Sequence, residues 1–152
     1  MGLFSKLFAK PPEPEKSFTD PILGPMTWSD EAEAWSGHHN SFDFLIDYTQ
    51  KKLPSPAILA YAREILNDPS WLQATLLEAK TKFKHDIPAK HRALHNDEID
   101  NLTWDQISFG FYRKPVNGEN RRIFATLNGG HDYRCWRIEY LYRTCSGLGF
   151  DT

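Results

Sequence analysis

The sequence predicts a single α+β domain: an antiparallel β-sheet of about five strands, two helices packed on one face, and a C-terminal three-stranded meander. Short segments alternate apolar and polar residues with a period of two, which is typical of half-buried strands. Two central segments instead repeat apolar residues at helical spacing. Strands and helices are grouped and do not alternate as βαβ units, which favours α+β. A length of 152 residues fits one domain with its own core.

Residues 1–16 are predicted to form an amphipathic peptide and a proline-rich linker, and residues 17–152 the domain. The apolar residues that would share one face of a short N-terminal helix are Leu3, Phe4, Leu7 and Phe8. The prolines of "PPEPE" (11–15) cannot continue that helix. The segment lacks the long apolar core of a signal peptide, and no run approaches the roughly 20 apolar residues of a transmembrane helix. We therefore expect no stable membrane insertion.

The first third of the domain is predicted to contain one broken strand and one regular strand. "DPILGPMTWS" (20–29) is predicted to be a short edge strand interrupted by Gly24-Pro25. "DEAEAWSG" (30–37) is predicted to be an acidic loop or a single helical turn. "SFDFLIDYTQ" (41–50) alternates cleanly. The residues on the inner face of that strand are Phe42, Phe44, Ile46 and Tyr48.

Two helices follow, and each has a start signal. Ser55-Pro56 supplies an N-cap and a proline at the first helical position, and Asp68-Pro69 repeats the pattern. The apolar stripes are Ile58, Leu59, Ala62, Ile65 and Leu66 in the first helix, and Trp71, Leu72, Leu76, Ala79 and Phe83 in the second. Residues 86–102 show only weak helical periodicity. "TWDQ" (103–106) fits a capping box, which predicts a single helical turn.

The C-terminal third is predicted to be the meander. "ISFGFYRK" (107–114) and "RRIFATLN" (121–128) alternate, and Asn117-Gly118 between them is the preferred pair of a type I′ turn. "GGHD" (129–132) then turns the chain into a third strand, "YRCWRIEYLYR" (133–143). The residues that share one face of this strand are Trp136, Ile138, Tyr140 and Tyr142.

No motif of established chemistry is present, so the sequence predicts no catalytic residue, no resident metal and no cofactor. His131 and Asp132 leave a hairpin turn, and neighbouring strand residues point to opposite faces, so we interpret this pair as structural. A metal site at His38-His39 would need further ligands; Asp43 and Asp47 are available, but nothing in the sequence fixes them nearby, so we interpret this pair as part of a solvated loop.

Composition limits the location and the partner class. The formal net charge of −2 argues against a dedicated nucleic-acid binder. Cys135 and Cys145 would lie roughly 33 Å apart on one strand, too far for a disulfide. Two free thiols indicate a reducing compartment, so we expect a cytoplasmic protein.

The charges form patches, and this pattern favours a protein partner. Acidic residues gather early in the chain, and arginines flank the predicted hairpin. Such patches beside tryptophans are typical of charge-complementary interfaces. The residues predicted to contact the partner are Trp35, Trp104, Asp30, Glu31, Glu33, Arg121 and Arg122. We interpret the chain as a non-enzymatic protein-interaction module and, by analogy of size and charge, as an immunity or antitoxin-like protein of bacteria.

The alternative is a small hydrolase or metal-dependent enzyme that uses histidines near the hairpin loops. Its candidate residues are His38, His39 and His131. An enzyme requires these histidines to converge with carboxylates in one pocket, whereas an interaction module requires a broad surface with exposed tryptophans. The sequence leaves the oligomeric state open.

Several segments resemble a bacterial family catalogued as domain of unknown function 2262. They are "FTDPILGPMTW" with the later "WSG", the helical pair, and the "GGH" that precedes an alternating strand. The resemblance extends from Phe18 to the end of the chain and excludes the N-terminal peptide. The sequence departs from the family at "KHDIPAKHRALHNDEIDN" (84–101). The resemblance implies a cytoplasmic bacterial protein and supplies no catalytic residues.

Overall fold

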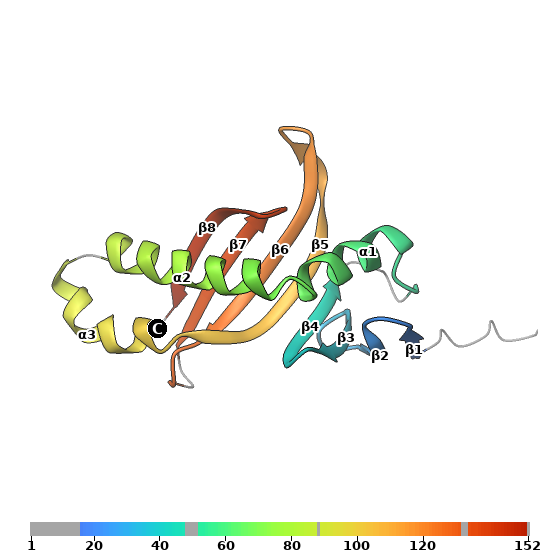
Figure 1. Cartoon of the computed structure of the whole chain (residues 1–152), viewed down its shortest axis with the longest axis horizontal. Coiled ribbons are helices and arrows are strands. Elements are labelled where there is room, and N and C mark those ends of the chain that lie inside the picture. Colours follow the sequence, from blue (N-terminus) through green and yellow to red (C-terminus); the bar gives the residue numbers. More distant parts are fainter. Residues whose placement is uncertain (1–15, 48–51, 88, 132–133, 152) are drawn as a thin grey trace, which may run out of the picture.

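A computed structural model describes residues 16–47, 52–87, 89–131 and 134–151. They form one eight-stranded sheet and three helices (Figure 1). The strands are β1 (Ser17–Asp20), β2 (Gly24–Ser29), β3 (Ala34–His39), β4 (Phe42–Asp47), β5 (Thr103–Val116), β6 (Glu119–Asn128), β7 (Cys135–Leu141) and β8 (Thr144–Asp151). The helices, α1 (Pro56–Leu66), α2 (Pro69–Asp86) and α3 (Ala89–Asp100), lie between β4 and β5 in the chain.

The strands lie in the sheet in chain order, and all neighbours are antiparallel except β4 and β5. In this parallel pair, Phe44 lies opposite Ile107 and Ile46 opposite Phe109. Parallel neighbours require a long crossover, which the three helices supply. The sheet therefore consists of two four-stranded meanders joined by one parallel pair.

The predicted sheet of about five antiparallel strands is wrong in its N-terminal half. The segment 20–29, predicted as one strand, contains a turn between β1 and β2, because the Asp20 carboxylate accepts the backbone N–H groups of Ile22 and Leu23, each at 2.9 Å. The predicted acidic loop or turn at 30–37 contains most of β3, which pairs with β4 over its whole length.

The C-terminal half also differs from its prediction, because the meander has four strands and not three. The predicted third strand ends at Leu141, where Tyr142 adopts a positive φ of 55° and turns the chain into β8. The "TWDQ" capping box starts β5, because Thr103 pairs with Asn128 of β6. The weakly periodic segment 86–102 contains the third helix, so the prediction of two helices is wrong as well.

The local start and turn signals are confirmed. Ser55 accepts the backbone N–H of Ile58 at 3.4 Å, and Asp68 accepts that of Trp71 at 3.0 Å, so both are N-caps. Asn117 and Gly118 have φ values of 51° and 80°, as a type I′ turn requires. The predicted strand at 41–50 forms β4, although Tyr48 lies outside the described residues.

The helices pack on one face of the sheet, and the core lies between them and that face. Tyr61 of α1 contacts Phe109, Trp71 of α2 contacts Tyr140, and Phe83 of α2 contacts Trp136, all in edge-to-face geometry. The strand residues between these positions point to the opposite side, which we call the helix-free face. On β5 to β7 it bears Gln106, Ser108, Tyr112, Arg122, Phe124, Arg137 and Glu139.

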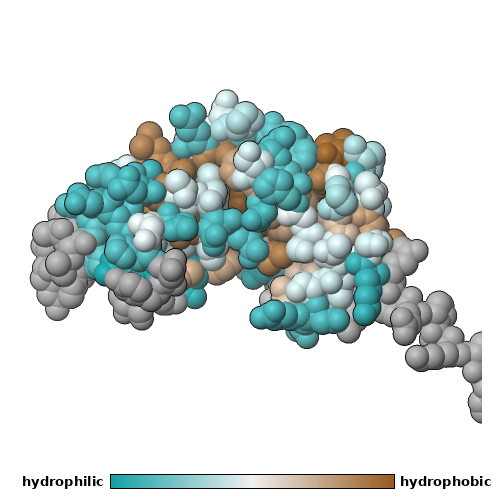
Figure 2. Space-filling model, turned by 90° about the horizontal axis from the view of Figure 1, so that it is seen from below, coloured by the Kyte–Doolittle hydropathy of each residue, from teal (hydrophilic) through white to brown (hydrophobic). Residues whose placement is uncertain are grey.

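On the face seen from below, hydrophilic residues are widespread and hydrophobic ones form separate patches between them (Figure 2). The large hydrophobic side chains exposed among the described residues are Ile22, Leu53, Leu77 and Val116. Val116 is at the tip of the β5–β6 hairpin, which extends beyond the helices (Figure 1). No helix in the described part of the chain is both long and apolar enough to cross a membrane.

Candidate functional site

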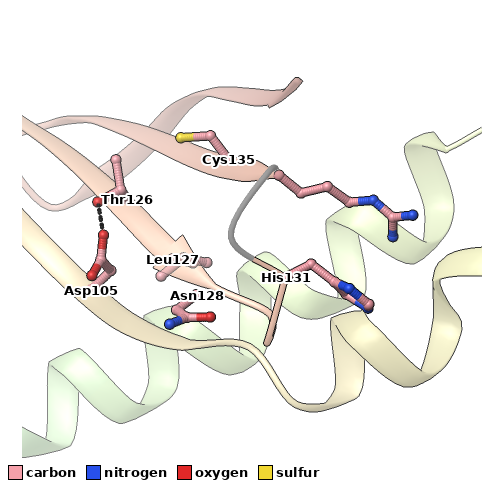
Figure 3. Close-up of a pocket in the computed structure, with 7 residues that line it drawn as sticks. Asp105, Thr126, Leu127, Asn128, His131 and Cys135 are labelled. Carbon is pink, nitrogen blue, oxygen red and sulfur yellow. Dashed lines mark hydrogen bonds between the residues drawn. The ribbon is translucent and has the colours of Figure 1, made fainter. Parts of the chain in front are cut away.

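A hollow of about 320 Å³, here called the loop pocket, lies where the sequence places the "GGHD" turn (Figure 3). β5, β6, β7 and the β6–β7 connection contribute to it. Its described lining residues are Asp105, Thr126, Leu127, Asn128, His131, Arg134 and Cys135. This set contains a thiol, an imidazole and a carboxylate, which are the groups of a Cys–His–Asp nucleophile system.

The geometry of the loop pocket does not assemble that chemistry. Figure 3 shows the His131 ring turned toward the helices, away from Asp105 and from the Cys135 thiol. The hydrogen bond drawn among the lining residues runs from the Thr126 hydroxyl to Asp105 at 2.9 Å. A nucleophile and its base must lie within hydrogen-bond reach of each other, about 3 Å. Asp132, the second residue of the predicted pair, lies outside the described residues.

The buried carboxylate of Glu98 binds Arg134, one of the residues that line the loop pocket. Glu98 of α3 accepts Trp136 Nε1–H at 2.9 Å and also accepts the Arg134 guanidinium. Burial alone would raise the pKa of Glu98, but the hydrogen bonds from Trp136 and Arg134 outweigh it and hold this pKa below its usual range. Arg134 Nη1 also donates to His95 Nδ1 at 3.1 Å. The cluster joins α3 to the start of β7.

Gly129 is required by the close approach of this carboxylate. A Cβ added at Gly129 would lie 2.5 Å from Glu98 Cγ, well inside van der Waals contact. We expect Gly129→Ala to lower the free energy of unfolding by about 1–3 kcal/mol, as overpacking does, because the hydrogen bonds of Glu98 prevent an easy shift. Chemical denaturation would measure this change. In a Glu98→Ala background the same substitution should have little effect, and an undiminished cost there would contradict the steric explanation.

The histidines proposed for the enzyme alternative lie in two separate places, His38 and His39 on β3 and His131 after the end of β6. His38 Nδ1 bonds to Asp43 at 2.7 Å and His39 Nε2 bonds to Asn67 at 3.0 Å, both near the end of β3. His131 follows β6, and β4 and β5 lie between β3 and β6. Three strand spacings correspond to about 14 Å, so the three histidines do not share one ligand. Within the described ranges, no group of three or more His, Cys, Asp or Glu side chains could hold a metal ion.

Trp35, a member of the predicted contact set, is fully buried in the structure. Its side chain is 0% exposed and contacts the rings of Phe18 and Trp28 edge-on. The indole N–H donates to the backbone oxygen of Lys52 at 2.8 Å. Trp35 points inward because 34–39 is a strand, whereas the acidic loop or helical turn predicted at 30–37 would leave its side chain exposed. Trp104 is half-buried against the core.

The predicted charged contacts occupy three separate places. Asp30, Glu31 and Glu33 are exposed in the β2–β3 turn, where Asp30 accepts Trp28 Nε1–H at 3.0 Å. Arg121 and Arg122 are neighbours on β6 and therefore point to opposite faces of the sheet.

Arg121 faces the helices. Its guanidinium lies 3.6 Å from the centre of the Tyr142 ring, and it donates to Glu119. The hydrogen bonds from Arg121 hold the pKa of Glu119 at about 2. Arg121 is thus committed to contacts within the chain.

Arg122 lies on the helix-free face within a row of polar groups. It donates to Asp47 at 3.4 Å and lies 5.6 Å from the centre of the Tyr112 ring. Burial raises the pKa of Asp47, and the charge of Arg122 only partly offsets this effect. The Tyr112 hydroxyl donates to Glu139 Oε1, and burial raises the pKa of Tyr112.

A second hollow, of about 390 Å³, lies at the base of the β5–β6 hairpin and is here called the hairpin hollow. The end of β4, the start of α1 and the strand β5 border it. Its described lining residues are Asp47, Lys52, Leu53, Ser55, Ile58, Phe111, Tyr112 and Arg113. Apolar groups from Leu53, Ile58 and Phe111 thus occur beside two cations, Lys52 and Arg113.

Comparison with family models, curated proteins and solved structures finds no match.

The hairpin hollow contains no residue of the predicted contact set. It escapes sequence inspection because its lining comes from three segments that only the parallel β4–β5 pairing brings together. The signal that could have found part of it is the period of two in β5, which places Phe111 on the inner face and Tyr112 on the outer one. Glu98 gave no signal, because Arg134 and Trp136 follow it by 36 and 38 residues.

Proposed function

We propose that the chain is a non-enzymatic protein-binding module whose partner docks at the hairpin hollow and the adjoining tip of the β5–β6 hairpin. The observation that supports this function best is a hollow at the base of a projecting hairpin, lined by apolar groups, by Lys52 and Arg113, and by the Asp47 carboxylate that Arg122 pairs with. Interfaces typically place one buried anchor side chain in such a pocket and surround it with polar contacts.

The apolar groups define the anchor. Leu53 is 51% exposed and Val116 is 46% exposed, and both belong to the small set of exposed large hydrophobic residues. Ile58 and Phe111 are buried more deeply and line the same hollow. An aliphatic or aromatic side chain of the partner would cover Leu53 and contact Phe111.

The charges define what surrounds the anchor. Arg113 and Lys114 are exposed near the hairpin tip, and the exposed Lys52 lines the hollow together with Arg113. These cations favour a partner with carboxylates on either side of its anchor residue. Binding by such a surface should weaken as salt concentration rises. An immunity or antitoxin-like role is one proposal within this class.

The test is a binding experiment with a surface variant. Full-length protein and its Leu53→Asp variant would be used to capture partners from the host lysate, with products of neighbouring genes co-expressed. We expect one stoichiometric protein to bind the unaltered chain and to bind Leu53→Asp at least about tenfold more weakly, because the carboxylate repels the partner's acid groups and occupies the anchor position. Calorimetry with the purified pair would give both dissociation constants.

Leu77→Asp is the matched control. Leu77 is 66% exposed on α2 and does not line the hairpin hollow. Both substitutions are on the surface and should leave the free energy of unfolding within about 0.5 kcal/mol of the original. Equal loss of binding in the two variants, or no loss in Leu53→Asp, would rule out the hairpin hollow as the docking site.

A further inference from the structure

The strand β8 is an edge of the sheet with few of the features that normally protect an edge. Strand order leaves β1 and β8 at the two edges, and β1 has only four residues whereas β8 has eight. Edges are usually protected by lysines, prolines or short length. The sequence of β8, "TCSGLGFD", contains no lysine, arginine or proline. Its pairing with β7 is irregular near Ser146 and regular from Gly147 to Asp151.

Two charged side chains of β7 lie over two glycines of β8 on the helix-free face. Glu139 lies opposite Gly147, and Arg137 lies opposite Gly149. A Cβ built at Gly149 would be 3.3 Å from Arg137 Nε, and one built at Gly147 would be 3.7 Å from Glu139 Oε2. The glycines thus leave space that the two side chains use, with a hollow of about 150 Å³ beside them.

This arrangement is complementary to itself under a two-fold rotation. If a second copy pairs antiparallel with β8 about Leu148, then Gly147 of one copy lies opposite Gly149 of the other. Across the four neighbouring strands the facing residues are then Glu139 and Gly147 of one copy, followed by Gly149 and Arg137 of the other. Two glycines therefore separate Glu139 from the second copy's Arg137. Their Cα atoms would be about 14 Å apart, a span that two long side chains can bridge when no intervening side chain blocks them. Symmetry produces this pair twice.

We propose that two copies of the chain associate through β8 into one continuous sheet, with Glu139 of each copy paired with Arg137 of the other. On the helix side, the half-buried Leu148 of one copy meets that of the other at the axis. Glu139 can serve both contacts, because its Oε1 accepts the Tyr112 hydroxyl while its Oε2 is the atom near Gly147. The hairpin hollow lies outside this interface, so the inference is independent of the proposed function.

The test is charge exchange, read out by sedimentation velocity of the purified full-length chain. The unaltered protein should dimerise with rising concentration. Arg137→Glu and Glu139→Arg should each raise the dimer dissociation constant at least about tenfold, because each places like charges together twice. An equimolar mixture of these two variants should form heterodimers, and the double variant Arg137→Glu/Glu139→Arg should recover self-association, because both restore opposite charges.

Three results would overturn the proposal. They are a monomer at every concentration, single variants that dimerise like the original, and a double variant that fails to recover. Circular dichroism would confirm that each variant is folded. If a charge variant does not fold, Leu148→Lys supplies the readout, because it places two ammonium groups opposite each other at the axis and should also yield a monomer. Leu53→Asp should leave the dimer unchanged.

Discussion

Replacement of Asp20 by alanine is expected to lower the free energy of unfolding by about 3 kcal/mol, because it removes a buried acceptor and leaves buried and partly buried donors without a partner. The Asp20 side chain is 2% exposed and accepts the backbone N–H groups of Ile22 and Leu23. It also accepts two hydrogen bonds from the Arg63 guanidinium, one from Nε at 3.1 Å and one from Nη2. This one carboxylate therefore forms the β1–β2 turn and attaches it to α1.

The same contacts predict a dependence of stability on pH. The hydrogen bond from Arg63, opposed by burial and assisted by the two backbone N–H groups, lowers the pKa of Asp20 from 3.8 to about 2. Because the pKa is lower in the folded state, the contribution is fully present above pH 3.8 and is lost as pH falls toward 2. The difference corresponds to about 2 kcal/mol. Denaturation at several pH values should show this loss in the unaltered protein and not in Asp20→Ala.

Asp43→Ala is the control for this experiment. Asp43 also accepts a side-chain nitrogen, from His38, but its side chain is 69% exposed. Exposed pairs of this kind contribute at most about 1 kcal/mol. Equal destabilisation by the two substitutions would show that burial of the Asp20 carboxylate is unimportant.

Local signals predicted the parts of the fold that depend on local chemistry. Ser55 and Asp68 cap their helices, and Asn117-Gly118 forms its turn, because each requires only neighbouring backbone groups. The predicted number of strands was wrong where the inner residues of a strand are small. In β3 the inner position after Trp35 is Gly37, and a Cβ there would be 2.5 Å from the Phe44 ring. Glycine removes the alternation that would have identified this strand.

The third helix was not predicted because polar residues occupy buried positions on it. The residues of α3 that are buried include His95 and Glu98 beside Ile99, so the helix has no continuous apolar stripe. These polar groups are acceptable inside because Arg134 and Trp136 satisfy them. The partners belong to a distant strand, and no periodicity in a single segment can reveal them.

The parallel β4–β5 pairing could not be predicted from the sequence either. Alternation identifies strands without naming their neighbours. Grouped strands on both sides of a helical segment fit two separate antiparallel sheets as well as one mixed sheet. Residues of β4 and β5 line the hairpin hollow, so the candidate docking site could be identified only from the three-dimensional structure.

Substitution of Trp35 by alanine distinguishes a core residue from a partner contact. The side chain is fully buried, contacts the rings of Phe18 and Trp28, and donates to the Lys52 backbone. Its removal should lower the free energy of unfolding by about 3–5 kcal/mol, through lost burial and a cavity. Thermal and chemical unfolding would measure this loss.

Trp104→Ala provides the comparison within the same residue type. Trp104 is only half-buried against the core, so its loss should lower the free energy of unfolding by about 2 kcal/mol or less. A residue that serves binding behaves in the opposite way, because its removal weakens the complex and leaves unfolding nearly unchanged. If Trp35→Ala unfolded like the original chain and lost a partner, Trp35 would have to reach the surface. In that case β3 would not pair with both β2 and β4 in solution, because that pairing is what directs the indole inward.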